Sequence, residues 1–304
     1  MARPRSGAGR RSLVGRVRAA ALVVLGLGAL AACTRVVTVD VDEGPVRLVV
    51  DARVLAGGFS RVVLSTTDAY SSSEVPPPVE DAVVAITDDR GGRFDCPLAG
   101  SPKGTYRCDL GPGGLGTNDP AVGVTYTLTI DYHGERYQAS AKLDPVPPID
   151  SLYFKFEAKG ISQGDSGFRA VIDYSDPAGV KNFYLWELFV DGVQQFRIDP
   201  GNRFRLISED RFYDGGEVIG YQPFDEDVVE PGSVVEVRQL SLSEEAYRYF
   251  FVLFEQTTSG GGPFATPPAS VRGNVANLTN PQHRALGFFL VGAETFRIAV
   301  VPDR

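Results

Sequence analysis

Short segments rich in β-branched residues, separated by clusters of Gly, Pro, Asn and Asp, dominate this chain. Residues 124–130 alternate strictly between large apolar side chains and threonine, which is the pattern of a β-strand with one buried face. Residues 46–52, 61–66 and 82–86 are similar short segments bounded by turn residues. Roughly seven such strands in about 100 residues predict an antiparallel, immunoglobulin-like β-sandwich over residues 45–143.

A proline-rich stretch, residues 144–150, follows this predicted sandwich. Its three prolines favour an extended, semi-rigid linker that cannot pair fully with a sheet. Beyond it, residues 151–304 return to strand-like segments, with Asp191-Gly192 as a favoured hairpin turn. The chain is therefore expected to be mainly β, with an N-terminal immunoglobulin-like sandwich followed by a second β-rich domain.

One α-helix is expected in the second domain, near residues 242–256. Ser241 and Glu244 match a capping box, and aromatic side chains recur every three or four residues after it. This apolar face consists of Tyr247, Phe250, Phe251 and Phe254. Residues 286–291 and 296–301 are then expected to form two separate strands that pair with each other.

The first 32 residues have the features of a secretory signal: six arginines, no acidic residue and an apolar run that ends in small residues. The apolar run is too short for a hydrocarbon core, which needs about 20 helical residues. Residues 30–33, Leu-Ala-Ala-Cys, resemble a bacterial lipobox. We therefore predict a lipoprotein signal peptide at 1–32 and a tether at 33–44. A plain cleaved signal peptide and a lone transmembrane anchor are the alternatives.

Cleavage before Cys33 would leave its thiol for diacylglycerol and its amine for an acyl group such as palmitate; no other cofactor is expected. Each buried CH₂ contributes about 0.8 kcal/mol, so two or three chains hold a protein durably at a membrane. Thr34, where some inner-membrane lipoproteins have aspartate, favours the outer membrane, facing either the periplasm or the cell surface.

Loss of the predicted leader would change the net charge from −8 to −14, because the leader holds six arginines and no acidic residue. Such an acidic chain is a poor binder of nucleic acid, whose phosphates are contacted by Lys and Arg. It also lacks the charge for electrostatic attachment to anionic lipid. Membrane attachment is therefore expected to depend on the lipid at Cys33.

Two further cysteines, Cys96 and Cys108, would both lie outside the cytoplasm after export. An even pair in an oxidising compartment predicts a disulfide, here across a short hairpin. Closing so short a loop stabilises a fold by about 3 kcal/mol in the chain-entropy description. A zinc pair is the alternative, but the CxxC spacing and nearby histidines are missing.

Several different short motifs are distributed along nearly the whole chain. Besides the lipobox they are residues 47–51 (RLVVD), 78–84 (PVEDAVV), 123–128 (GVTYTL), 176–179 (DPAG), 182–184 (NFY), 263–265 (PFA), 273–275 (GNV) and 286–289 (LGFF). Together they resemble the DUF4249 family of Bacteroidota-type outer-membrane lipoproteins. The resemblance implies an accessory or capture role beside TonB-dependent transporters, and it implies no catalytic residues.

The sequence offers little for catalysis. His133 and His283 are the only histidines, and His133 lies in a predicted turn. Lipidation and disulfide formation would leave no free thiol for a Cys/His enzyme. Residues 111–116 match G-x-G-x-x-G but do not lie between a strand and a helix, as dinucleotide binding requires. We therefore expect no enzymatic activity.

Acidic residues at two places offer oxygen ligands for calcium. Asp225, Glu226 and Asp227 are consecutive, and Asp173 with Asp176 is a weaker case. Neither group has the spacing of an EF-hand loop. A solvated acidic loop is therefore the favoured interpretation, and no metal site is predicted.

Tyr184 and Trp186 are two residues apart in a predicted strand, so both side chains lie on one face. Most aromatic residues of a β-sandwich pack in its core. The alternative is a platform on which a sugar or peptide ligand stacks. We keep the platform as a hypothesis for these two residues.

These features together predict a non-enzymatic, lipid-anchored outer-membrane protein that captures a ligand for, or caps, a TonB-dependent transporter. Two alternatives remain open. One is a surface hydrolase of glycan or peptide that uses carboxylates within residues 199–232. The other is a structural or adhesion protein of the envelope.

Overall fold

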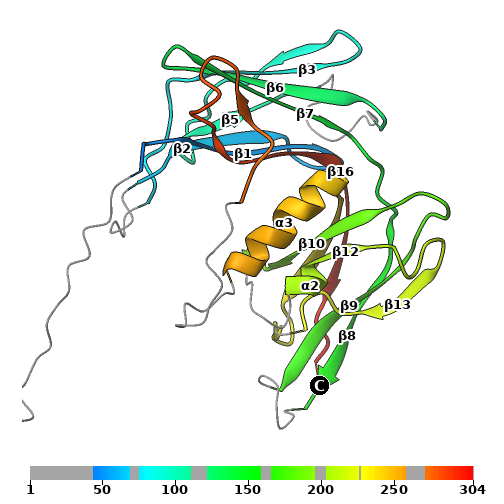
Figure 1. Cartoon of the computed structure of the whole chain (residues 1–304). Helices are drawn as coiled ribbons and strands as arrows, with labels where there is room; N and C mark the ends of the chain where they lie inside the picture. The colour runs from blue at the N-terminus through cyan, green and yellow to red at the C-terminus, as the bar shows by residue number, and fades with distance from the viewer. Residues whose placement is uncertain are drawn as a thin grey trace, which may run out of the picture. The chain divides into compact units, whose positions relative to one another are not determined.

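One long strand, β16 (Leu286–Val300), organises the computed structural model (Figure 1). Its first half pairs in parallel with β1 (Leu48–Ala56), and its second half pairs antiparallel with β14 (Val234–Ser241). β16 thereby joins strands from both ends of the chain into one eight-stranded sheet. The structure describes residues 44–68, 75–110, 122–158, 166–195, 203–225, 227–257 and 271–303.

The first core is a β-sandwich between part of this sheet and a five-stranded antiparallel sheet (Figure 1). β1, β2, β5 and the first half of β16 form one layer, and the strands in the order β15-β7-β6-β3-β4 form the other. The strands not yet given are β2 (Arg61–Thr66), β3 (Val83–Asp88), β4 (Arg93–Asp95), β5 (Thr105–Arg107), β6 (Thr125–Tyr132), β7 (Glu135–Lys142) and β15 (Ala276–Asn277). The prediction of a mainly β chain with a sandwich-like arrangement is confirmed.

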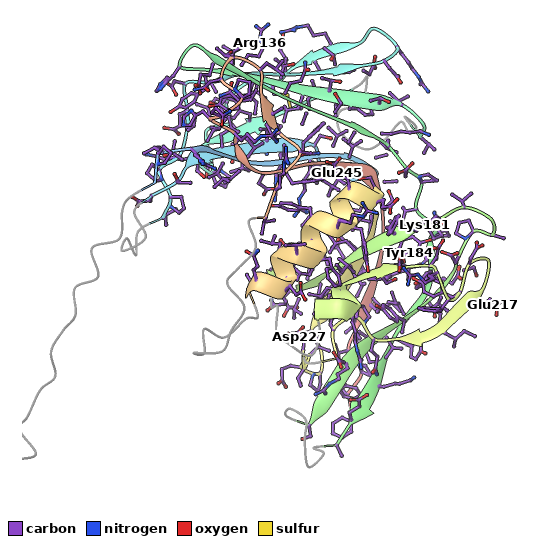
Figure 2. The ribbon with its side chains drawn as sticks, viewed as in Figure 1. Arg136, Lys181, Tyr184, Glu217, Asp227 and Glu245 are labelled. Carbon is purple, nitrogen blue, oxygen red and sulfur yellow. A yellow bond between two sulfur atoms is a disulfide. The ribbon has the colours of Figure 1, made fainter. Side chains whose placement is uncertain are left out.

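The second core lies between the other half of the eight-stranded sheet and a three-stranded sheet, β13-β9-β8. Tyr184 points into this core from β10, whereas Glu217 at the start of β13 is exposed (Figure 2). The elements of this half are β8 (Ile149–Glu157), β9 (Gly167–Ser175), β10 (Phe183–Val190), β11 (Val193–Gln195), α2 (Arg203–Leu206), β12 (Ile207–Glu209) and β13 (Glu217–Tyr221).

The predicted helix is present as α3 (Glu244–Thr257) and covers the other face of β10 and β16. The ring of Tyr247 lies 5.0 Å from that of Phe183 on β10. The ring of Tyr249 lies 4.7 Å from that of Phe288 on β16. The face of β16 that carries Phe288 therefore belongs to the second core, while the opposite face belongs to the first.

The cap of α3 differs from the predicted capping box. Ser243, not Ser241, accepts the hydrogen bond from Ala246 N, at 3.1 Å from its Oγ. Ser241 still belongs to β14, and its Oγ donates to Asp144 O and accepts from Ala293 N. Because these bonds fix the Ser241 hydroxyl between two other segments, it is not available to cap the helix.

The prediction of two separate strands at the end of the chain is wrong, since one strand runs from Leu286 to Val300. Gly292, which directly follows the first predicted strand, lies in the middle of β16. A Cβ atom at Gly292 would lie 2.4 Å from Ser241 O. The glycine thus allows a close approach of two strands and does not form a turn.

The proline-rich segment 144–150 separates the two cores in sequence, but its Val146 packs against both. Ser241 Oγ donates to Asp144 O at 2.5 Å, and Arg297 Nε donates to Ile149 O at 2.8 Å. β15 and β16, which follow the predicted linker, pair with strands that precede it. The residues from Pro45 onward consequently form one compact unit with two cores. The predicted signal peptide, and the tether up to residue 43, lie outside the described residues.

The predicted disulfide joins Cys96 and Cys108 across 12 residues. Both cysteines are buried in the first core. Cys96 N bonds to Val84 O of β3, while Cys108 directly follows β5 in the opposite sheet. The bridge therefore ties together the two layers of the sandwich.

Substitution of Gly287 tests the close pairing of β1 and β16. Its φ is +87°, and a Cβ atom would lie 2.0 Å from Val50 O. We expect Gly287→Ala to lower the free energy of unfolding by at least about 2 kcal/mol, because it combines backbone strain with a clash against main chain. Gly134→Ala is the control, since its φ is +81° but nothing lies within 4 Å of the added atom. Equal losses in urea unfolding would contradict this account.

Candidate functional site

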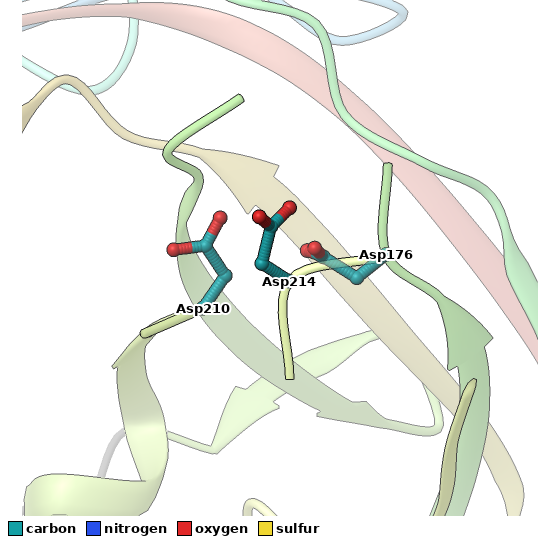
Figure 3. A group of neighbouring side chains, drawn as sticks. All are labelled: Asp176, Asp210 and Asp214. Carbon is teal, nitrogen blue, oxygen red and sulfur yellow. The ribbon is translucent and has the colours of Figure 1, made fainter. Parts of the chain in front are cut away.

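Three aspartates meet where the loops between strands of the second half converge (Figure 3). Asp176 follows β9, Asp210 follows β12, and Asp214 lies in the turn before β13. One carboxylate oxygen from each lies within 4.8 Å of the other two. We call these three residues the aspartate cluster.

Hydrogen bonds hold the two buried members in fixed orientations. The Tyr184 hydroxyl donates to Asp176 Oδ1 at 2.5 Å, and Gly215 N donates to Asp176 Oδ2 at 3.1 Å. Asn182 N donates to Asp210 Oδ2 at 2.6 Å, and Asp210 N donates in return to Asn182 O at 3.1 Å. Each carboxylate is therefore positioned by main chain from a neighbouring element.

The third member, Asp214, is exposed and bonds across to the loop that carries Asp176. Its Oδ1 accepts a hydrogen bond from Gly179 N at 2.7 Å. Gly179 has a φ of +78°, which suits the tight turn that follows β9. Asp214 thus connects the loop after β9 to the turn before β13.

The cluster concentrates negative charge, and two of its three aspartates are sheltered from water. The exposed fractions of Asp176 and Asp210 are 6% and 2%. Burial raises the pKa of Asp176, and the neighbouring carboxylates of Asp210 and Asp214 raise it further, against the hydrogen bonds from Tyr184 and Gly215. An all-oxygen donor set of this kind suits a hard cation.

The acidic residues that the sequence offered as weak calcium candidates, 225–227, lie outside the aspartate cluster. Asp225 Oδ2 lies 2.8 Å from Arg205 Nη1, so this carboxylate already has a cationic partner. Asp227 is joined to its own turn by a bond from its N to Phe224 O, and Glu226 lies outside the described residues. This stretch contributes no residue to the three-carboxylate cluster found in the described part of the chain.

Asp173, the companion suggested for Asp176, also lies outside the aspartate cluster. It accepts hydrogen bonds from Ser151 Oγ at 2.6 Å and from Gly220 N at 2.7 Å. Although burial opposes the effect, these bonds lower the pKa of Asp173. Asp176 therefore takes its partners from β12 and the turn after it, at a sequence distance that spacing alone does not reveal.

Tyr184 and Trp186 lie on one face of β10, but they are core residues and do not form an exposed platform. Their exposed fractions are 0% and 1%. Tyr184 packs against Tyr174 of β9, and Trp186 packs against Tyr221 of β13, with ring centroids 5.6 and 4.8 Å apart. The cavity that Trp186 lines is about 50 Å³, enough for water molecules but not for a sugar.

The two histidines, 150 residues apart, line one open depression beside the start of β1. His133 Nε2 lies 3.0 Å from Asp81 Oδ2 at an exposed turn. His283 contacts Glu135 Oε2 through Nδ1 at 3.1 Å and Val46 O through Nε2 at 2.8 Å. Both of these partners are acceptors, and the hydrogen bond to Glu135 raises the pKa of His283, which favours the doubly protonated ring. His283 therefore joins segments together and has no free nitrogen to act as a base.

A belt of charged side chains crosses the face of the eight-stranded sheet beside α3, and its Arg53 and Glu187 line one cavity with Phe250 and Phe254. Arg53 Nη1 lies 2.7 Å from Glu187 Oε1, and Arg238 Nη1 lies 3.3 Å from Glu294 Oε1. Burial, with a contribution from the carboxylates of Glu187 and Glu236, raises the pKa of Glu294 to about 7, although Arg238 and Arg53 oppose the rise. The belt separates the sheet face under α3 from the rest of that face.

Past the belt, the same face is apolar and exposed. The register pairs Arg238 with Phe296 and Glu236 with Ile298, so the side chains of these four residues share this face. The exposed apolar residues, with their exposed fractions, are Val234 (44%), Phe296 (48%), Ile298 (55%) and Val300 (61%). We call these four residues the apolar strip. The sequence pattern suggested strands here but not which face stays open.

The fold and these surfaces define a mainly β protein with two cores, a sheltered carboxylate cluster and an open apolar strip. The chain belongs to the family described as a domain of unknown function, DUF4249, whose model matches residues 34–297. The match covers both cores without interruption at the proline-rich segment. No curated protein matches the chain. Among the described residues, no helix is both long and apolar enough to cross a membrane.

Glu294 makes the stability of this fold depend on pH. Its pKa in the folded protein is above the ordinary 4.5, so the stability due to its bound proton is present below pH 4.5 and is lost as the pH rises through about 7. We expect Glu294→Gln to reduce the fall in unfolding free energy between about pH 5 and pH 8 by about 2 kcal/mol. Both proteins keep His283, so its contribution cancels in the comparison. Parallel pH profiles in urea unfolding would contradict the prediction.

Proposed function

We propose that this protein is a lipid-anchored accessory protein of the outer membrane, which docks on a TonB-dependent transporter to capture its ligand or cap it. The lipobox ending at Cys33 supports the anchor, and the association with a transporter is what the resemblance of the sequence motifs implies. The observation that carries the proposal is the apolar strip. The strip offers a binding surface. Among the described residues, neither histidine belongs to a catalytic arrangement.

The apolar strip has the composition expected of a docking surface. Its four residues are adjacent on two paired strands, so they present a continuous apolar patch. The charged belt of Arg238, Glu236 and their neighbours borders it on one side. Protein interfaces commonly combine such an apolar centre with a polar rim. Full burial of one isoleucine side chain contributes about 1.5–3 kcal/mol, so burial of the strip would add to the affinity for a partner.

A surface hydrolase using carboxylates of residues 199–232 remains the alternative, because Asp210 and Asp214 come from that stretch. Both would need access to substrate, yet Asp210 is 2% exposed. A screen against glycans and peptides tests this alternative: activity abolished by Asp225→Asn or Asp214→Asn would favour the hydrolase.

A structural or adhesion protein of the envelope is the other alternative. Such a protein would leave nutrient uptake unchanged when its gene is deleted.

The membrane anchor is tested by Cys33→Ala. Without the thiol there is no lipid, so we expect the variant to leave the membrane fraction while keeping the thermal unfolding midpoint of the parent. Membrane fractionation followed by a melting curve measures both properties. A variant that stays in the membrane fraction would contradict the proposed lipid anchor.

Docking is tested with Ile298→Glu on the apolar strip. A buried unpaired carboxylate is costly, so we expect at least about a tenfold loss of transporter recovered with the lipoprotein from solubilised outer membranes. Ile219→Glu is the matched control, because Ile219 on β13 is 72% exposed and lies outside the strip. If the parent protein recovers no TonB-dependent transporter, the proposed function fails. If both variants behave alike, the partner uses another surface.

A further inference from the structure

We propose that the aspartate cluster, together with the side-chain oxygen of Asn182, binds one calcium ion. Asp176, Asp210 and Asp214 would each contribute a carboxylate oxygen, and water would complete the shell. The site lies on loops of the second half, away from the apolar strip. It therefore stands independently of the proposed docking function.

Asn182 provides an observation separate from the acidic residues. Its exposed fraction is 6%, and its Oδ1 is fully buried with no hydrogen-bond partner among the described residues. Asn182 directly precedes β10 and continues its register with β12, because Asp210 N donates to Asn182 O and Asn182 N donates to Asp210 Oδ2. Opposite residues of an antiparallel pair have their side chains on one face, so Asn182 shares the face of Asp210. A buried amide oxygen without a partner costs about 1–3 kcal/mol, and a cation would satisfy it.

The charge balance also calls for a cation. Three carboxylates meet within 4.8 Å, and no ion pair in the described part of the chain reaches any of them. Lys181, the basic residue next to Asn182, lies 3.4 Å from Glu244 and 3.9 Å from Glu209 instead. A divalent ion would offset most of the negative charge of the three carboxylates.

The donor set favours calcium over other common ions. The ligands are all oxygens, whereas zinc prefers sulfur and nitrogen. Calcium binds at about 2.3–2.6 Å, so it can bridge oxygens up to about 5 Å apart, and it tolerates irregular geometry. Donors from two separate loops, 176–182 and 210–216, fit this tolerance better than the strict octahedron that magnesium requires at about 2.1 Å.

Calcium at this position would fix the turn that displays Phe212. Phe212 lies between Asp210 and Asp214, and its side chain is 89% exposed. The ion would attach both ends of this turn to the loop that carries Asp176. The turn would then present an aromatic side chain in a calcium-dependent manner.

The test uses the purified lipoprotein in detergent, with Tb³⁺ and Ca²⁺ as probes. Tyr184 bonds to Asp176, so it should sensitise Tb³⁺ luminescence at the cluster. We expect saturable luminescence that Ca²⁺ displaces, and at least about a tenfold weaker apparent Ca²⁺ affinity in Asp214→Asn. Asp214 is chosen because it is exposed, so its replacement spares the core. Glu217→Gln on β13 is the control and should bind as the parent does.

A second measurement reports on the turn itself. Chymotrypsin cleaves after exposed aromatic residues, so Ca²⁺ should slow cleavage at Phe212 in the parent by at least about tenfold and leave Asp214→Asn unprotected. Cleavage at Phe59, which is 70% exposed in the other half, should not respond. The proposal is overturned by no saturable Ca²⁺ binding up to about 10 mM, by unchanged affinity in Asp214→Asn, or by tighter binding of Mg²⁺ than of Ca²⁺.

Discussion

The main-chain pairing of β16 with two different partners is the interaction on which the rest of the structure depends. Along its first half the strand bonds to β1, and along its second half to β14. Gly287 and Gly292 make this possible, because side chains there would collide with Val50 O and Ser241 O. The Asn274 side chain bonds to both N and O of Phe289, which satisfies the strand where β14 does not reach. Without β16, the two cores would share no sheet.

The two halves of β16 differ in how much of their surface is available for binding. One face of its first half is buried in the sandwich and the other beneath α3, so little of that half is available for binding. Only past Glu294 does the strand leave the cover of the helix, and there Phe296, Ile298 and Val300 become exposed. The charged belt marks this transition. An interaction surface can therefore exist on β16 without disturbing either core.

The aspartate cluster depends on the same architecture in a less direct way. Asn182 and Tyr184 are fixed by the pairing of β10 with β12 and β14, and they orient Asp210 and Asp176 in turn. The loops at this end are therefore held by strands on several sides. Such support is what a preorganised cation site requires, because the ligands are held close together before the ion arrives.

By itself, the sequence determined several local elements and the Cys96–Cys108 disulfide. Strict alternation over residues 124–130 predicted the strand β6, and the aromatic periodicity after Ser243 predicted α3, because both depend on neighbours close in the chain. The buried pair Cys96–Cys108 followed from cysteine count and compartment in the same way.

Only the tertiary structure decided the partners of these elements. Whether Tyr184 and Trp186 were core or platform depended on β9 and β13, which cover them. Asp176 met Asp210 and Asp214 rather than Asp173, across a separation that no local pattern encodes. Gly292 lies inside β16, where Ser241 O leaves no room for a side chain, so this glycine allows a close approach of two strands and does not form a turn. Local propensity acts over a few residues, whereas strand pairing and the meeting of loops depend on contacts between distant segments, which form only when the whole chain folds.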